Sequence, residues 1–252
     1  IQNNGRVGIG TTTPAAPLHV EGSRGSTMFQ MSNLFGITLE PTTNDRIVRL
    51  GNGSGDWSGG FDFWADDPSL QHSLMRIQNN GRVGIGTTSP ATALDVVGTT
   101  RTGVLEITGG ADLAEPFEVA GGSGAARIRQ GMVVTIDCAR PGELRLASEP
   151  YDLKVAGVIS GANGLSPGLV MKAEGKDGAD GKHPVALSGR VWCWVDAGYG
   201  AVHPGDLLTT SATPGLAMVA SDASRRSGAV LGKAMTALEN GRGLVLVLVS
   251  LQ

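Results

Sequence analysis

Two carboxylates next to a tryptophan are the strongest candidates for chemistry in this sequence. Asp66 and Asp67 follow Trp64 closely, and Trp57 lies a short distance upstream. Aromatic faces stack on sugar rings, and carboxylates accept hydrogen bonds from sugar hydroxyls. These four residues are therefore the candidate contacts for a sugar or another receptor. Polysaccharide cleavage would require the two carboxyls to flank a cleft.

The same segment also has a structural interpretation, which we favour. Phe61 and Phe63 alternate around Asp62, and in a β-strand alternate residues point to opposite faces. The two phenylalanines would then be core residues of one strand, with the aspartate pointing outward.

Other reactive side chains lack the spacing that a catalytic or metal site needs. The histidines are scattered without ligand spacing: His19, His72, His183 and His203. Cys138 and Cys193 form no C-x-x-C motif, and the sequence leaves open whether they pair as a disulfide. Asp112 and Glu115 are a further acidic pair. No nucleophile motif or phosphate-binding loop accompanies them, so we predict no metal and no cofactor.

Composition indicates an all-β protein that assembles with copies of itself. The 252 residues include 39 glycines, only 4% are aromatic, and the net charge is −3. Few large side chains are available to fill a core, so burial against identical chains is expected. No cluster of Lys and Arg exceeds the pair Arg225-Arg226, which argues against a nucleic-acid partner. The longest apolar run, Gly243–Ser250, is far too short for a membrane span, so no membrane insertion is expected.

The chain contains a long internal repeat. Residues 1–22 and 77–98 align without gaps, and their first twelve positions are identical, I-Q-N-N-G-R-V-G-I-G-T-T. Asn-Gly predicts a tight turn, Val-Gly-Ile a short strand, Thr-Thr-x-Pro a corner, and Leu-x-Val a second short strand. Glycine between Val and Ile would let another backbone approach closely. Because the chain begins inside this repeat, we expect it to be a fragment of something longer.

Further short strands are expected on both sides of the second repeat. Before it they are predicted at Thr27–Met31, Gly36–Glu40, Arg46–Leu50, Gly60–Trp64 and Ser73–Ile77, and after it at Val104–Thr108. Thr236–Asn240 could hold one helical turn at most. A weaker duplication relates Gln130–Thr135 to Pro204–Thr209 and continues through two later segments, so a β-domain of two related halves is predicted.

The repeated block resembles a module of phage tail fibres and related bacterial fibre proteins. Val7–Gly22 and Val83–Gly98 both match V-G-I-G-T-T-x-P-x-x-x-L-x-V-x-G. The resemblance implies an intertwined homotrimeric β-shaft of β-prism or β-helix type. It also implies an extracellular or virion-tail location and an upstream fibre or baseplate protein as partner. A fibre of a contractile injection system or a bacterial surface filament is an alternative.

The segment after the second module resembles the start of the C-terminal domain of self-cleaving phage appendages. The pattern is Ala111-Asp112-x-Ala114-Glu115, with Val155–Ser160 downstream. In that family a hydroxyl residue commonly precedes the Ala-Asp pair, whereas Gly109 and Gly110 stand here. Self-cleavage needs an activated nucleophile. We therefore expect no enzyme, and Asp112 and Glu115 are only weak autoproteolysis candidates.

Together these features predict an all-β protein with a trimeric β-shaft and a compact β-rich C-terminal head. The predicted parts are a first fibre module (1–22), a shaft insert (23–76), a second module with a hinge (77–110), and a head (111–252) with halves at about 111–170 and 185–252. The expected function is structural and adhesive. The head would cap the shaft and bind a cell-surface glycan or protein through loops such as Gly175–His183 and Ser221–Ser227. A self-cleaving assembly domain and a polysaccharide depolymerase are the enzymatic alternatives.

Overall fold

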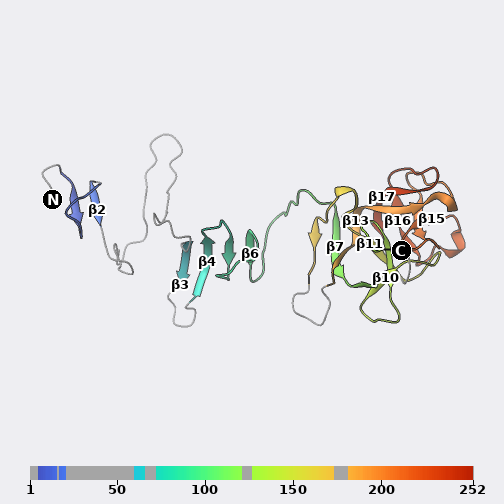
Figure 1. Ribbon diagram of the computed structural model, residues 1–252, viewed down its shortest axis with the longest axis horizontal. Coiled ribbons are helices and arrows are strands. Elements are labelled where there is room, and N and C mark those ends of the chain that lie inside the picture. Colours follow the sequence, from blue (N-terminus) through green and yellow to red (C-terminus); the bar gives the residue numbers. More distant parts are fainter. Residues whose placement is uncertain are drawn as a thin grey trace. The chain divides into compact units, whose positions relative to one another are not determined.

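A computed structural model describes residues 5–15, 17–20, 60–65, 72–120, 127–172 and 181–251. The chain divides into two compact units, Ile1–Arg101 and Thr102–Gln252 (Figure 1). The described residues form β-strands and three single-turn 3-10 helices, with no α-helix. The predicted all-β class is therefore confirmed.

The first unit contains both copies of the repeat, and each copy folds into two short parallel strands. In the first copy β1 (Val7–Ile9) pairs with β2 (Leu18–Val20), and in the second β5 (Val83–Ile85) pairs with β6 (Leu94–Val96). The second copy is extended by two antiparallel strands, β3 (Gly60–Ala65) and β4 (His72–Gln78), in the order β3-β4-β5-β6. The Asn-Gly turn joins β4 to β5, as the sequence predicts.

Side chains within each repeat hold its corner in place. Arg6 and Arg82 occupy equivalent positions, and each donates to the carbonyl oxygen of its own corner proline, Pro14 or Pro90, at 3.1 Å. Next to that corner, the backbone N–H of Ala91 donates to the Asp95 carboxylate at 2.9 Å. The same links in both copies explain how so short a connection joins two parallel strands, which usually need a longer crossover.

The glycine in the middle of each first strand is required by the chain's own corner. A Cβ on Gly84 would lie 2.3 Å from the carbonyl oxygen of Thr87, and one on Gly8 would lie 2.4 Å from that of Thr11. Real Cβ atoms do not approach that closely, so only glycine fits. The prediction of a close backbone approach is right, but the approaching backbone belongs to the same module.

The second unit is one large sheet that partly closes on itself. Its strands are β7 (Asp112–Phe117), β8 (Val119–Ala120), β9 (Val133–Ile136), β10 (Leu144–Leu146), β11 (Val155–Ile159), β12 (Leu169–Val170), β13 (His183–Asp196), β14 (Leu207–Thr210), β15 (Ala217–Val219), β16 (Val230–Ala234) and β17 (Arg242–Ser250). The order β15-β14-β16-β17-β13, together with a β13–β15 pairing, makes a small closed barrel. The long strand β13 also pairs with β7 and β11.

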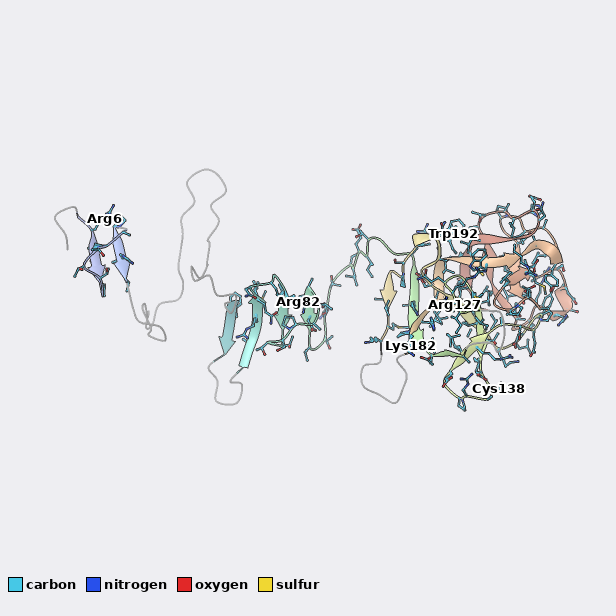
Figure 2. All side chains as sticks on the ribbon, in the orientation of Figure 1. Arg6, Arg82, Arg127, Cys138, Lys182 and Trp192 are labelled. Atoms are coloured by element: carbon cyan, nitrogen blue, oxygen red, sulfur yellow. The ribbon has the colours of Figure 1, made fainter. Side chains whose placement is uncertain are left out.

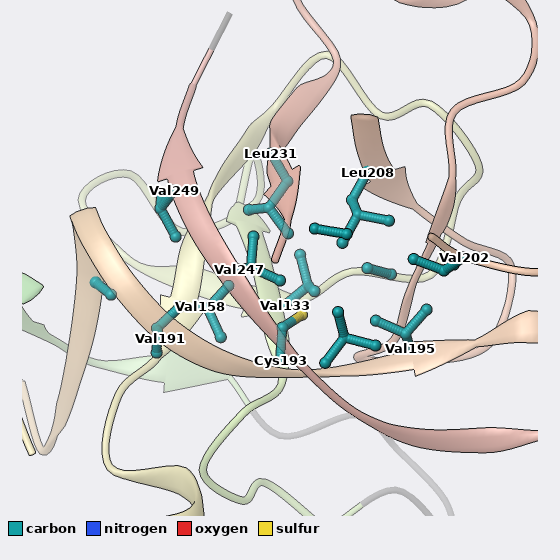
Figure 3. Packing of buried hydrophobic residues seen from close by; sticks show 14 of the residues in the cluster. Val133, Val158, Val191, Cys193, Val195, Val202, Leu208, Leu231, Val247 and Val249 are labelled. Carbon is teal, nitrogen blue, oxygen red and sulfur yellow. The ribbon is translucent and has the colours of Figure 1, made fainter. Parts of the chain in front are cut away.

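The barrel interior is filled by small and medium apolar side chains (Figure 3). The alternate residues of β13 and β17 that point inward are at most 1% exposed: Val191, Cys193, Val195, Val245, Val247 and Val249. Fully burying a valine contributes about 1.5–3 kcal/mol, so these two strands anchor the unit. A second cluster, which includes Val134, Leu144 and Ile159, lies under β9, β10 and β11.

The two halves of this unit share one pattern of strand pairing. β9 lies between β10 and β11 as β14 lies between β15 and β16, and every one of these pairings is antiparallel. The register also corresponds, because Val134 pairs with Leu146 as Leu208 pairs with Val219. In each half a glycine of the third strand, Gly157 or Gly232, meets a backbone carbonyl oxygen of the next strand.

The structure contradicts one local prediction and decides several others. No strand forms at Val104–Thr108, where the chain has no ladder partner and Val104 is 85% exposed. Thr236–Asn240 contains no helical turn. Cys138 is exposed, Cys193 is buried, and both are free, so they form no disulfide. The predicted strands at Gly60–Trp64 and Ser73–Ile77 correspond to β3 and β4, whereas those at 27–31, 36–40 and 46–50 lie outside the described residues.

Candidate functional site

The predicted sugar-contact residues lie largely outside the described part of the chain. Trp57, Asp66 and Asp67 are not among the described residues. Trp64 belongs to β3 and pairs with Ser73 beside an irregularity in the register, but its side chain is not described. These four residues remain a prediction.

The acidic pair Asp112 and Glu115 does not converge on one site. Both lie on β7, three residues apart, where buried and half-buried side chains alternate. An odd spacing along a strand places two side chains on opposite faces. Asp112 is therefore buried on one face and Glu115 half-buried on the other, so they cannot act together on a single bond.

Asp112 has an unusual environment for a carboxylate. It is only 5% exposed, and both its carboxylate oxygens and the Oγ atom of Ser160 are buried without a hydrogen-bond partner. Burial raises the pKa of Asp112 above its ordinary value of 3.8. The Ser160 hydroxyl lies near enough to oppose this rise, but only in part. Buried polar groups without partners are costly and rare, so the charged form of this carboxyl is poorly compensated in the fold.

The second module carries an uncovered apolar face. Directly paired residues share a face of a sheet, and the pairs Met75–Ile85, Ile77–Val83, Val83–Leu94 and Ile85–Val96 place apolar side chains on one side of β4, β5 and β6. Leu94 is 59% and Ile85 41% exposed. The first module repeats this pattern, with Ile9 and Leu18 each 56% exposed. Within the described residues of one chain, the same apolar surface is therefore open in both modules.

The predicted receptor loop at Ser221–Ser227 is held by its own hydrogen bonds. The Asp222 carboxylate accepts from the Ser224 backbone N–H and hydroxyl, and these bonds lower the pKa of Asp222. The Arg225 guanidinium lies over the Tyr151 ring, 4.5 Å from its centroid, and donates to the Pro150 carbonyl oxygen. Most polar groups of this loop already have partners within the chain. Of the other predicted loop, residues 175–180 are not described.

The outward face of β13 and β17 is the surface that sequence reasoning missed. Trp192 and Trp194 point away from the barrel interior; Trp194 packs against the second apolar cluster, and the Arg129 guanidinium lies 4.1 Å from its ring centroid (Figure 2 labels Trp192). The alternation in Val191–Val195 already signalled two outward tryptophans. Of their cationic neighbours, Arg190 lies on the same strand, whereas Lys233 lies on β16 and Arg129 precedes β9, so only the folded structure brings the three together.

Neither metal-binding clusters of three or more side chains nor membrane-spanning helices occur in the described residues. They contain no group of three His, Cys, Asp or Glu side chains placed to hold a metal ion. They also contain no helix that is long and apolar enough to cross a membrane.

Comparisons with known proteins include a weak structural similarity. No protein-family model and no curated protein match the chain. A crystal structure of the pre-mature bacteriophage phi29 gene product 12 aligns with 71% of this chain at 17% sequence identity and a TM-score of 0.40. The alignment covers 24% of that protein, so this chain spans about a quarter of its length. At this TM-score the similarity carries no argument about function.

Proposed function

We propose that this chain is a structural and adhesive subunit of a homotrimeric fibre of the tail-fibre type, placed outside the cell or on a virion. The modules would form a shaft with other copies, and the C-terminal unit would be a head that caps it. An upstream fibre or baseplate protein would join the assembly to a larger particle.

The apolar face of the modules carries this proposal. Met75, Ile77, Val83, Ile85, Leu94 and Val96 line one side of a narrow sheet with no described layer over it. Monomeric proteins rarely leave a continuous apolar patch uncovered. Because both modules present the same face, a repeating partner with matching repeats covers it most simply, and a second copy of the chain is such a partner. The number three comes from the resemblance of the modules to phage fibres.

Trimer formation also gives the adhesive role a physical basis. Three identical heads on one axis would engage a repetitive cell surface together. The second and third contacts then form at a high effective concentration, so weak individual sites give strong overall attachment.

The molar mass in solution tests the assembly. Analytical ultracentrifugation at micromolar concentration should give three times the 25.8 kDa chain mass. Leu94→Asp should shift the sample towards monomer, because each Leu buried in the shared core contributes about 1.5–3 kcal/mol and a buried unpaired charge opposes burial. Thr100→Asp is the matched control, since it adds the same charge at an exposed position after β6. A monomeric or dimeric wild type would contradict the proposal.

Asp112 supports a second candidate function, self-cleavage near Gly109–Asp112. Hydrolysis would break one peptide C–N bond, with the hydroxyl of water going to the carbonyl carbon and a proton to the leaving nitrogen. A carboxyl whose pKa is raised can supply such a proton. Intact-mass measurement of a chain extended upstream tests this. Two fragments that are absent in Asp112→Asn would support cleavage, and a single uncut mass after prolonged incubation would exclude it.

A further inference from the structure

The outward face of the barrel has an ordered arrangement of side chains. Along β13 and β17 the odd-numbered residues Val191, Cys193, Val245 and Val247 fill the core, so the even-numbered residues face outward. Cross-strand pairing places Arg190 beside Leu248, Trp192 beside Leu246, and Trp194 beside Leu244. The neighbouring strand β16 adds Lys233 beside Leu248.

These pairings define two rows that run across three strands. The first row is Lys233, Leu248 and Arg190. The second is Met235, Leu246 and Trp192, where the Met235 backbone N–H donates to the Leu246 carbonyl oxygen. Strands lie about 4.8 Å apart, so each row is about 10 Å wide, and successive outward residues are about 7 Å apart along a strand. We call these six residues the Trp192 strip. Its dimensions match one to two pyranose rings.

The strip is positively charged, and the N–H groups of its polar side chains are hydrogen-bond donors. Arg190 and Lys233 are exposed, and neither side chain forms an ion pair or a hydrogen bond within the described chain. Arg129 adds a third positive charge beside the strip, over Trp194. The acid nearest along β13 is Asp196, which Arg242 neutralises through a 2.8 Å ion pair. A chain with net charge −3 thus carries a local positive surface, with Leu248 43% exposed at the centre of the first row and Met235 42% exposed at the end of the second.

We propose that the Trp192 strip binds an acidic sugar polymer, one whose pyranose rings carry carboxylates. The partly exposed Trp192 ring offers a face for the C–H groups of a sugar. Arg190 can donate two parallel N–H hydrogen bonds to one carboxylate, whereas Lys233 attracts a carboxylate mainly through its charge. A neutral glycan would leave both cations without partners, and a bare anion would leave the apolar centre uncovered. Only a ligand with both an apolar ring face and a negative charge satisfies the whole strip.

This proposal deepens the adhesive role proposed above and depends on it. The test uses the full chain and two matched probes: an oligomer of galacturonic acid and its methyl ester, which keeps the rings and removes the charge. Titration followed by calorimetry should show binding of the acid only. Binding should weaken as salt rises, because exposed charges are screened over about 8–10 Å at physiological ionic strength. Inorganic polyphosphate serves as an anion without sugar rings.

Single substitutions test the assignment of residues. Trp192→Ala and Arg190→Ala should each weaken binding about tenfold, as expected for an aromatic anchor and a charge-assisted contact. Lys233→Ala should weaken binding of the acid oligomer several-fold, and because the side chain is exposed its removal should leave the fold intact. Lys172→Ala is the matched control, because Lys172 is exposed and also forms no ion pair in the described chain. It should bind as the wild type does.

The outcomes separate this site from the fibre proposal. A wild type that is trimeric but binds no acid oligomer would overturn the strip and leave the assembly standing. Polyphosphate that binds as tightly as the acid oligomer would show that the strip attracts any anion, and so would a Lys172→Ala variant that loses as much binding as the strip variants. Either result would overturn the proposal. Loss of the trimer in Arg190→Ala or Lys233→Ala would identify the strip as a contact between copies and likewise overturn it. Selective acid binding that follows Trp192, Arg190 and Lys233 supports it.

Discussion

Replacing Asp112 by Asn should stabilise the second unit at neutral pH. The Asp112 carboxylate is 5% exposed, has only the nearby Ser160 hydroxyl and no hydrogen bond of full geometry to compensate it, and has a raised pKa because of burial. A folded-state pKa above the unfolded value means that folding favours the neutral acid. The neutral form is complete below the ordinary pKa of 3.8, so stability is greatest there and falls as the pH rises through the folded pKa. Asn keeps the shape and removes the charge.

The magnitude follows from what the carboxylate lacks. A buried acceptor without a full hydrogen bond costs about 1–3 kcal/mol. Asp112→Asn should therefore raise the free energy of unfolding by about 1–2 kcal/mol at pH 7.5. The gain should shrink towards zero near pH 3.5, where the wild-type carboxyl is also neutral. Urea unfolding followed by tryptophan fluorescence, at a fixed chain concentration, measures both values.

Asp196→Asn is the control with the opposite sign. Burial alone would raise the pKa of Asp196, but hydrogen bonds from Thr213, the Gly198 backbone and Arg242 outweigh it and lower the pKa. Its stabilising effect is therefore present above the ordinary value of 3.8 and lost as the pH falls through the folded pKa. Asp196→Asn should destabilise the protein at pH 7.5. Destabilisation by Asp112→Asn at pH 7.5, or a gain that does not vary with pH, would refute the reasoning about Asp112.

Three further predictions concern close contacts and the repeated corner. Gly232→Ala should lower the free energy of unfolding in urea by about 1–3 kcal/mol, because its Cβ would lie 2.2 Å from the Leu248 carbonyl oxygen. Gly103→Ala is the control and should leave this free energy unchanged, because its Cβ would have no atom within 4 Å. Gly84→Ala should make the second module more sensitive to protease, because its Cβ would meet the Thr87 carbonyl oxygen at 2.3 Å, and an unchanged cleavage rate would count against the corner's role. His19→Asp should keep the module's melting temperature while His19→Ala lowers it, because His19 Nδ1 accepts the Ala15 N–H at 3.2 Å as Asp95 accepts that of Ala91.

The sequence predicted the short modules well because their signals are local. The Asn-Gly turn, a one-residue glycine alternation and a proline corner act within a few residues of one another, and in the second copy each appears in the structure where the pattern places it. The sequence pattern could not identify which atoms each glycine or polar side chain contacts in the folded module. Glycine in β5 was predicted to admit a neighbouring backbone, and only the folded corner identifies that backbone as Thr87. His19 aligns with Asp95 in the second copy, and only the structure shows that these different side chains accept equivalent hydrogen bonds.

The candidate site was harder to predict because it depends on long-range register. The strand expected at Val104–Thr108 has the right local composition, but a strand also needs a neighbour, and none pairs with it in the described chain. Asp112 and Glu115 were adjacent enough in sequence to suggest a pair, and the strand period separates them onto opposite faces. Arg190 and Lys233 are far apart in the chain and meet across Leu248 only through two antiparallel pairings.

The packing of the barrel explains why tryptophans occur on its outer face. Close strand approach at Gly232 and an interior of valines leave little room for large rings, so in Val191–Val195 the small residues must face inward. Burial raises the pKa of the Cys193 thiol, which makes this residue an inert part of the core. The strand period then fixes Trp192 and Trp194 on the outer face of the barrel before any ligand is considered.

Trp194 has a structural role on this face, because its indole N–H donates to the Gln130 carbonyl oxygen and Arg129 covers its ring. Trp192 has no such partner in the described chain. If Trp192 only covers Leu246, Trp192→Leu should bind the acidic sugar as the wild type does. If the Trp192 ring contacts the sugar, Trp192→Leu should weaken that binding.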